Sequence, residues 1–170
     1  MKKTLCLIFA FALLLSLSAC ASSEEKVQTP VYYYYRQMEL TYGADPGVLD
    51  KEAREAAGHL QDYTYLLSEY LEGPKNFSLY NPFPRNTVLR SFALQDGTAF
   101  VQLSASFASL TGLDLTLACA CITLTVCELT GAQQVTIRAD DSLLDGNPQI
   151  TMSPDSLLML DDSNIVIRPE

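Results

Sequence analysis

Histidine is nearly absent from this 170-residue sequence, in which His59 is the single example. A serine nucleophile needs a nearby base, and no serine here occupies the Gly-x-Ser-x-Gly turn that exposes such a nucleophile. Cys119, Cys121 and Cys127 have no histidine close by in the sequence, so their spacing matches no tetrahedral zinc pattern. We therefore predict no catalytic residue, no metal site and no cofactor. The three cysteines are interpreted as buried thiols that pack like small apolar side chains.

Basic residues are also scarce, because 11 lysines and arginines stand against 20 aspartates and glutamates, a formal net charge of −9. Nucleic-acid binding draws most of its affinity from basic side chains that displace counterions from phosphates, and such a surplus is missing here. Electrostatic attraction to anionic lipid is disfavoured for the same reason. We predict that the chain binds no nucleic acid and that its acidic surface serves solubility.

The apolar run Leu5–Leu17 near the N-terminus is about 13 residues long, too short for a spanning helix, which needs about 20. It follows two lysines and ends in small residues, which is the order of a cleavable signal peptide. The sequence Leu17-Ser18-Ala19-Cys20 resembles the bacterial lipobox. This resemblance implies removal of residues 1–19 and attachment of acyl chains, such as palmitate, to Cys20 at the outer face of the cytoplasmic membrane. An ordinary secretory signal or an uncleaved anchor is the alternative.

Cleavage at this position would leave 151 residues, enough for one domain with its own core. Residues 20–30 are polar, end in proline and are interpreted as a flexible tether. The run Val31-Tyr32-Tyr33-Tyr34-Tyr35 predicts a strand, because aromatic and β-branched residues favour extended backbone. Alternate tyrosine rings would then face the core and the solvent. A carbohydrate-binding platform is the functional alternative. Residues 36–47 predict a loop.

Helical spacing of apolar residues predicts an amphipathic helix over residues 60–72, which Gly73-Pro74 ends. Further along the chain, Asp96-Gly97 predicts a two-residue hairpin turn between strands at 87–94 and 98–104. A type I′ turn needs positive φ at both central residues, and Asp-Gly accepts that conformation readily.

Other segments are less clear from their residues alone. Residues 48–58 are ambiguous, because propensity favours a helix over residues 52–57 and Gly58 interrupts it. Residues 113–129 are rich in threonine and could form a buried strand, yet their length and an apolar stripe favour a helix. Residues 135–138 predict a strand. Ser153-Pro154-Asp155 predicts the start of a helix, and residues 165–167 predict a short terminal strand.

The order of these elements resembles the GerMN domain of sporulation and spore-germination proteins. The family's L-x-G-P helix end, P-x-P-x-x-T loop and D-G-x-x-x-V-x-L-S hairpin are matched by Leu71-Glu72-Gly73-Pro74, Asn81-Pro82-Phe83-Pro84 with Thr87-Val88-Leu89, and Asp96-Gly97-Thr98-Ala99-Phe100-Val101-Gln102-Leu103-Ser104. In addition, Glu52-Ala53-Arg54-Glu55 is similar to the family's E-x-R segment. That similarity implies a strand where propensity favours a helix.

The resemblance covers residues 31–141 and implies an α+β fold, with a small mixed β-sheet and two α-helices packed on one face. Residues 113–129 would form the second helix, and residues 142–170 a C-terminal extension that packs on the domain. The family is mostly lipid-anchored and is not known for enzymes. Its domain is similar to the ring-building modules of the channel between mother cell and forespore, which implies a role in envelope assembly.

The first hypothesis is a non-catalytic, lipid-anchored envelope protein with a single GerMN-like domain, serving as an interaction or scaffold module in sporulation or germination. Its expected partners are the membrane through Cys20, envelope or sporulation-complex proteins, and a second copy of the chain.

The alternative is a lipoprotein that binds cell-wall glycan or a small ligand through tyrosines and carboxylates. The candidate carboxylates are Glu52, Glu55, Glu69 and Glu72. A glycosidase would need two carboxylates about 5–10 Å apart. Glu69 and Glu72 share one helix face, but we expect them to be ordinary solvated charges.

Overall fold

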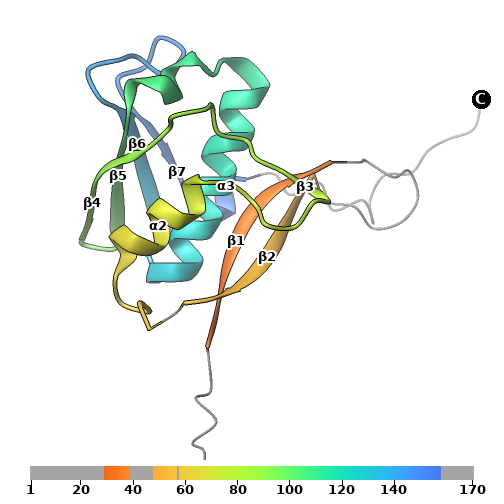
Figure 1. The fold of residues 1–170 in the computed structure, drawn as a ribbon. Coiled ribbons are helices and arrows are strands. Elements are labelled where there is room, and N and C mark those ends of the chain that lie inside the picture. The colour runs from red at the N-terminus through yellow and green to blue at the C-terminus, as the bar shows by residue number, and fades with distance from the viewer. Residues whose placement is uncertain (1–28, 39–47, 57, 158–170) are drawn as a thin grey trace, which may run out of the picture.

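Two β-sheets share one central helix in this chain (Figure 1). The computed structural model describes residues 29–38, 48–56 and 58–157. The first sheet has the order β2-β1-β3, formed by Leu49–Glu55, Pro30–Gln37 and Leu79–Tyr80. The second has the order β4-β5-β6-β7, formed by Leu89–Gln95, Thr98–Leu103, Gln134–Ala139 and Ile150–Met152. The α-helices of the described residues are α2, Tyr63–Leu71, and α3, Gly112–Thr130.

The predicted α+β class with two helices is confirmed. The second sheet is mixed, since β5 and β6 run parallel while its other pairs are antiparallel. Both helices contact this sheet on one face, where Val101 and Ile137 are buried while Phe100 and Arg138, which alternate with them, are exposed. The expectation of a single sheet needs correction, because β1, β2 and β3 form a sheet of their own.

Two side-chain hydroxyls from the helices bind the backbone of Tyr34 in β1. They explain why no described strand pairs with β1 at Tyr34 on the side away from β2. The hydroxyl oxygen of Thr125 on α3 accepts the backbone N–H of Tyr34 at 2.9 Å. The hydroxyl of Tyr70 on α2 donates to the backbone oxygen of Tyr34 at 2.8 Å. Because both backbone groups of Tyr34 are satisfied by helices, the strand can be buried without another strand beside it.

The tyrosine run forms β1 with the predicted alternation. Tyr33 and Tyr35 are buried, whereas Tyr32 and Tyr34 are half-buried on the opposite face. The hydroxyls of Tyr33 and Tyr35 donate to backbone oxygens of α2, at 3.1 and 2.8 Å. The buried rings therefore serve the core, as the structural interpretation expected.

Strand β2 overturns the propensity argument for residues 48–58. The segment pairs with β1 along its whole length, from Leu49 opposite Arg36 to Glu55 opposite Pro30. These ladder bonds and the packing of the strand outweigh the small helix preference of its residues, which is worth tenths of a kcal/mol each. The strand implied by the E-x-R resemblance is confirmed.

The amphipathic helix and the hairpin are confirmed. Helix α2 begins at Tyr63, because the Asp62 carboxylate accepts the backbone N–H of Tyr65 at 3.0 Å and caps the helix. In the hairpin turn, Asp96 and Gly97 have φ of +50° and +75°, as a type I′ turn requires.

Helix α3 resolves the ambiguous segment in favour of a helix, which ends at Gly131 with φ of +72°. It lies between the two sheets and is buried on several sides, among others at Leu115, Cys119 and Val126. A helix surrounded in this way carries no clear polar stripe, which is why its periodicity was weak. By length and composition α3 could span a membrane, but in this fold it is the core helix.

The segment after Ala139 adds structure that the sequence did not indicate. Leu144 is fully buried, and β7 pairs antiparallel with β6. The helix predicted from Ser153 is a single 3₁₀ turn, Pro154–Ser156, followed by extended backbone at Leu157. The loop predicted over residues 36–47 needs correction at its start, because Arg36 and Gln37 belong to β1 and pair with Tyr80 and Leu79. Residues 39–47, the anchor, the tether up to residue 28 and the predicted strand at 165–167 lie outside the described residues.

Candidate interaction surface

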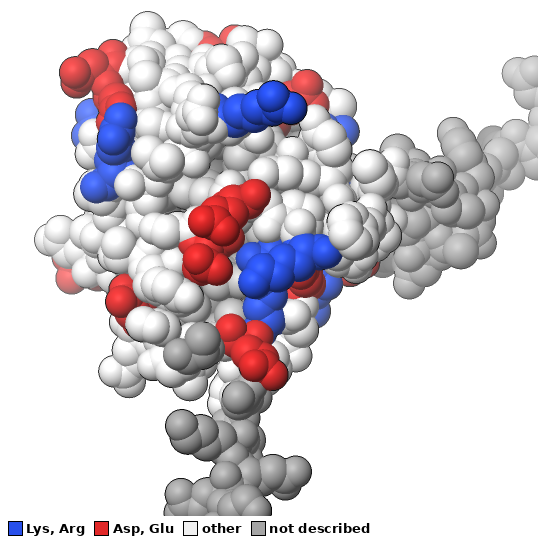
Figure 2. Space-filling model, in the orientation of Figure 1, with Lys and Arg blue, Asp and Glu red and all other residues white. Residues whose placement is uncertain are grey.

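Charged side chains are scattered over the face shown in Figure 2, where acidic and basic residues lie beside one another. Surface ion pairs of the described chain join different elements. Arg36 pairs with Asp114 on α3 at 2.9 Å, and Lys51 pairs with Glu128 at the other end of α3 at 3.7 Å. Exposed pairs of this kind contribute little stability. The charges on the face drawn in Figure 2 form no large patch of a single sign.

Arg54 clamps β2 to the C-terminal end of α2. Its guanidinium donates to the backbone oxygens of Gly73 at 2.6 Å and Glu69 at 3.3 Å. It also donates to the hydroxyl of Tyr35 and the carboxylate of Glu52, both at 3.1 Å. The Arg54 and Glu52 side chains are only 8 % and 11 % exposed. The E-x-R motif is therefore a nearly dry ion pair that joins two elements.

The electrostatics of this clamp suit a structural role. Burial alone would lower the pKa of Arg54, but the Glu52 carboxylate and the Tyr35 and Tyr33 phenols outweigh that effect and raise it. Burial in turn raises the pKa of Tyr33 to about 12. The Glu52 carboxylate also accepts the backbone N–H of Lys75, at 3.0 Å. Arg54 thus stays charged and Tyr33 neutral, and neither exchanges protons near neutral pH.

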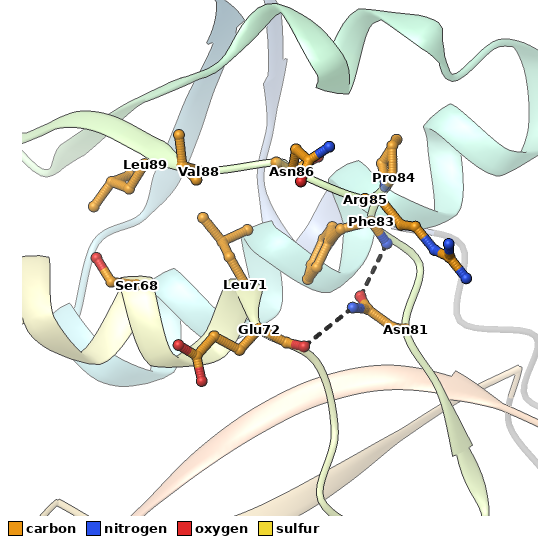
Figure 3. Close-up of a pocket in the computed structure, with 11 residues that line it drawn as sticks. Ser68, Leu71, Glu72, Asn81, Phe83, Pro84, Arg85, Asn86, Val88 and Leu89 are labelled. Carbon is orange, nitrogen blue, oxygen red and sulfur yellow. Dashed lines mark hydrogen bonds between the residues drawn. The ribbon is translucent and has the colours of Figure 1, made fainter.

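Gly73 brings the end of α2 against the proline-rich loop. Its φ is +105°, and a Cβ at this position would lie 2.5 Å from the Asn81 amide nitrogen. The Asn81 side chain donates to the backbone oxygen of Glu72 at 3.5 Å and accepts the N–H of Phe83 at 3.0 Å (Figure 3). The glycine permits both the turn and this close approach. The L-x-G-P helix end and the proline-rich loop therefore pack against each other as one local structure.

A cavity of about 500 Å³ lies between α2 and this loop (Figure 3). Leu71 and Phe83 contribute apolar surface to it, and Leu89 lines it where β4 begins. Glu72 and Arg85 also line it but point away from each other in the view. Within the described residues neither side chain forms an ion pair. We name this cavity the α2 groove.

Strand β4 continues from the α2 groove and is the outer strand of the second sheet (Figure 1). Most of its residues are exposed. Three apolar side chains on or beside it are also exposed: Val88 and Leu94 at 46 % each and Phe100 at 41 %. Val88 and Leu89 line the groove where the chain enters β4, so exposed apolar side chains are found both beside the groove and along the strand.

Comparison with known proteins identifies the family. A family model described as "Germane: Sporulation and spore germination" matches residues 30–145. The chain belongs to the Germane family. The match spans β1 to β6 and bears out the GerMN resemblance. A search of curated proteins found no match.

Two solved structures resemble this member of the Germane family. The tandem GerMN domains of the sporulation protein GerM from Bacillus subtilis match with a TM-score of 0.53 and 17 % identity, over 76 % of this chain and 47 % of that one. The chain thus spans about half the length of that structure, and the likeness shows the fold. A candidate lipoprotein from Clostridium perfringens matches with a TM-score of 0.43 and 17 % identity, over 76 % and 91 % of the two chains.

The carboxylates considered for a glycan site do not converge in this Germane-family fold. Glu52 is engaged by Arg54, and the Glu69 backbone is bonded to the same guanidinium. Among the described residues that line the α2 groove, Glu72 carries the one carboxylate. Glu55 is exposed on β2. The groove therefore lacks the pair of carboxylates that a glycosidase places across the scissile bond.

The other polar candidates also have structural partners. Ser104 accepts the N–H of Val88 at 3.0 Å, and Ser106 donates to the backbone oxygen of Asn86 at 2.9 Å, so both hold the segment that leads into β4. His59 is exposed, stacks on Tyr65 at 4.0 Å between ring centres and lies 3.8 Å from the Asp62 carboxylate. Residues 29–38, 48–56 and 58–157 contain no cluster of metal-ligating side chains.

The three cysteines of α3 are free thiols in this structure. Cys119 and Cys121 are buried, which confirms that they pack as apolar side chains. Cys127 is only half-buried, so the prediction of a buried thiol holds in part for this residue. Burial raises the pKa of Cys119 and of Cys121 to about 12. Such thiols carry almost no thiolate at neutral pH and are poor nucleophiles. Cys20, the predicted lipid site, lies outside the described residues.

The edge of β4 was missed by the sequence analysis, although a signal was present. The β4 segment Leu89–Gln95 carries one charged residue, Arg90, whereas β2, of equal length, carries five. Edge strands are usually protected by charge. The uncharged segment Ser91–Gln95, directly before the Asp96-Gly97 turn, is the pattern that indicates such an edge.

Proposed function

We propose that this Germane-family chain is a non-catalytic interaction module, lipid-anchored at the outer face of the cytoplasmic membrane and acting in sporulation or spore germination. The observation that carries the proposal is the family match over residues 30–145, which takes in most of the described fold. The lipobox-like sequence ending at Cys20 supports the anchor. The proposal also expects no binding to nucleic acid, in keeping with the net charge of −9.

The described chemistry supports interaction over catalysis. The most buried ion pair of the described residues, Arg54–Glu52, joins β2 to the end of α2. The α2 groove offers one carboxylate and one guanidinium that point apart, with no histidine among its lining residues. General acid–base chemistry needs groups that converge on a reacting atom. The accessible apolar surface beside β4 is instead suited to contact with another protein.

The partner is expected in the envelope. The solved GerM structure carries GerMN domains in tandem, and this chain spans 47 % of that structure. A chain with one such domain would place two domains side by side by binding another envelope protein or a second copy of itself. Anchoring at Cys20 would keep both partners near the same membrane surface and so raise their effective concentration.

The anchor is tested by Cys20→Ala in the full-length chain, with Cys6→Ala as the matched control inside the predicted signal peptide. We expect Cys20→Ala to abolish acylation, read as the loss of acyl mass, and to release or mislocalise the protein. Cys6→Ala should be acylated and should fractionate with membranes. If Cys20→Ala is processed and retained like the parent chain, the anchor is wrong.

The interaction role is tested by crosslinking in sporulating or germinating cells at native expression. Capture of envelope or sporulation proteins supports the module. Recovery of monomer alone would contradict it. A soluble chain that enriches on purified peptidoglycan would favour the glycan-binding alternative instead.

A further inference from the structure

Of the strand edges in the described structure, that of β4 is unprotected. Strand β2 carries five charged residues in seven, and β7 is only three residues long. Strand β4 has seven residues, and its one charge, Arg90, is paired with Asp140 at 3.3 Å. Charge, shortness and bulges are the usual protections against strand pairing between molecules, and the five-residue segment Ser91–Gln95, which follows the charge and the bulge at Arg90, has none of them.

The free backbone groups of β4 can be assigned from its register. Gln95 and Thr98 close the two-residue turn, so their backbone groups bond to each other, and those of Ala93 and Phe100 do the same two residues further on. The backbone groups of Phe92 and Leu94 therefore point away from β5. No hydrogen bond within the described residues uses them from that side.

We propose that this edge pairs with β4 of a second copy, antiparallel and about a twofold axis at Ala93, which joins two four-stranded sheets into one of eight strands. The proposal rests on the proposed interaction role and names its surface and partner. A bulge at Arg90 interrupts the ladder, so the regular part of the edge is Ser91–Gln95, and Ala93 is its centre. In the pair, Phe92 of each copy exchanges both backbone hydrogen bonds with Leu94 of the other.

The charges favour a second copy of this chain over a generic strand. With the axis at Ala93, Arg90 of each copy lies opposite Asp96 of the other. Asp96 forms no ion pair within the described residues. Arg90 contacts Asp140 of its own copy through Nε at 3.3 Å, but its side chain is still 53 % exposed, so it can also face Asp96 of the other copy. Two opposite-charge pairs therefore form at the ends of the contact, and the segment Ser91–Gln95 between them is uncharged.

The side chains at the axis also fit. Ala93 is exposed on the outer face of the sheet and lies beside Phe100 of β5, which is 41 % exposed. Residues opposite each other without mutual hydrogen bonds approach to about 4.5 Å between Cα atoms, a spacing that a methyl side chain tolerates. Pairing would bring together the apolar surfaces around both alanines on the outer face, which neither α2 nor α3 covers in the described part of the chain.

Disulfide trapping tests the axis directly. The same spacing of about 4.5 Å suits a disulfide, so Ala93→Cys in the full-length chain should crosslink to a dimer when membranes are oxidised with copper phenanthroline. The control is Ala53→Cys, an exposed alanine on the charged edge of β2. We expect at least about tenfold more dimer from Ala93→Cys than from Ala53→Cys or the parent chain. Equal yields would overturn the proposal.

Placing a charge at position 93 tests the same contact without oxidation. Ala93→Lys and Ala93→Glu should each sediment as monomers in detergent, and a mixture of the two should recover the dimer. Ala53→Lys should behave like the parent chain. A dimeric Ala93→Lys would overturn the axis, as would crosslinking of Ala93→Cys to a different protein without dimer. Membrane retention and acylation through Cys20 are measured separately, so failure of self-pairing is distinguishable from failure of the proposed function.

Discussion

Arg54 is the side chain on which the contact between β2 and α2 most depends, because one guanidinium serves four acceptors. Two of these are backbone oxygens at the end of α2, and the others are the Tyr35 hydroxyl and the Glu52 carboxylate. Removing one partner of a buried ion pair leaves the other charge dry and unpaired, which costs more than the intact pair contributes.

Arg54→Met should therefore lower the free energy of unfolding by about 3–5 kcal/mol, measured by urea denaturation. The control is Arg85→Met, because Arg85 is exposed and forms no ion pair within the described residues. The double variant Glu52→Gln with Arg54→Met should recover part of the loss, since no charge then stays buried. Equal effects of Arg54→Met and Arg85→Met would show that the clamp carries no stability.

Among the elements, α3 contains a natural comparison between two buried threonines. Thr125 accepts the N–H of Tyr34 at 2.9 Å and so satisfies the edge of β1. Thr123 is equally buried, but its hydroxyl has no hydrogen-bond partner among the described residues. The same substitution at these positions should thus have opposite consequences, because one hydroxyl satisfies a buried donor and the other only loses its hydration.

Thr125→Val should destabilise the chain by about 1–3 kcal/mol, since it keeps the volume and leaves the Tyr34 N–H unsatisfied. Thr123→Val should be neutral or slightly stabilising. Urea denaturation measures both, and amide exchange at Tyr34 should become faster in Thr125→Val alone. If both variants lose stability equally, the hydroxyl of Thr125 is not what closes the edge of β1.

Sequence patterns predicted the elements that are determined by neighbouring residues in the sequence. They failed for elements whose conformation is determined by tertiary contacts. The Asp96-Gly97 turn and the end of the helix at Gly73 follow from backbone preferences of single residues. Strand β2 could not be read from propensity, because pairing with β1 determines it. The α2 groove depends on Asn81 meeting the end of α2, a contact between residues nine positions apart that periodicity does not encode.

The whole molecule is organised by α3, which contributes to the core of both sheets. The core against β1 also includes three tyrosines, because Tyr70 of α2 lies 5.3 Å from Tyr33 and 5.1 Å from Tyr35 between ring centres. Burial raises the pKa of all three phenols, Tyr33 to about 12. These rings couple the stability of the fold to alkaline pH.

The sign of this coupling follows from the two states. Below pH 10 the phenols are protonated in both the folded and the unfolded chain, so their contribution to stability is fully present. Above pH 10 the unfolded chain releases these protons while the folded chain retains them, and stability falls by about 1.4 kcal/mol per pH unit for each such tyrosine. The loss continues until pH passes the folded-state pKa, about 12 for Tyr33.

Urea denaturation at intervals from pH 8 to 11.5 should show this decline as a falling free energy of unfolding. Tyr33→Phe should decline less steeply, by the slope of one proton, about 1.4 kcal/mol per pH unit. Comparison of the variant with the parent chain at pH 8 isolates the cost of the lost bond to Leu66, since both states are protonated there. Identical slopes in the two chains would mean that Tyr33 ionises in the folded state as freely as in the unfolded one.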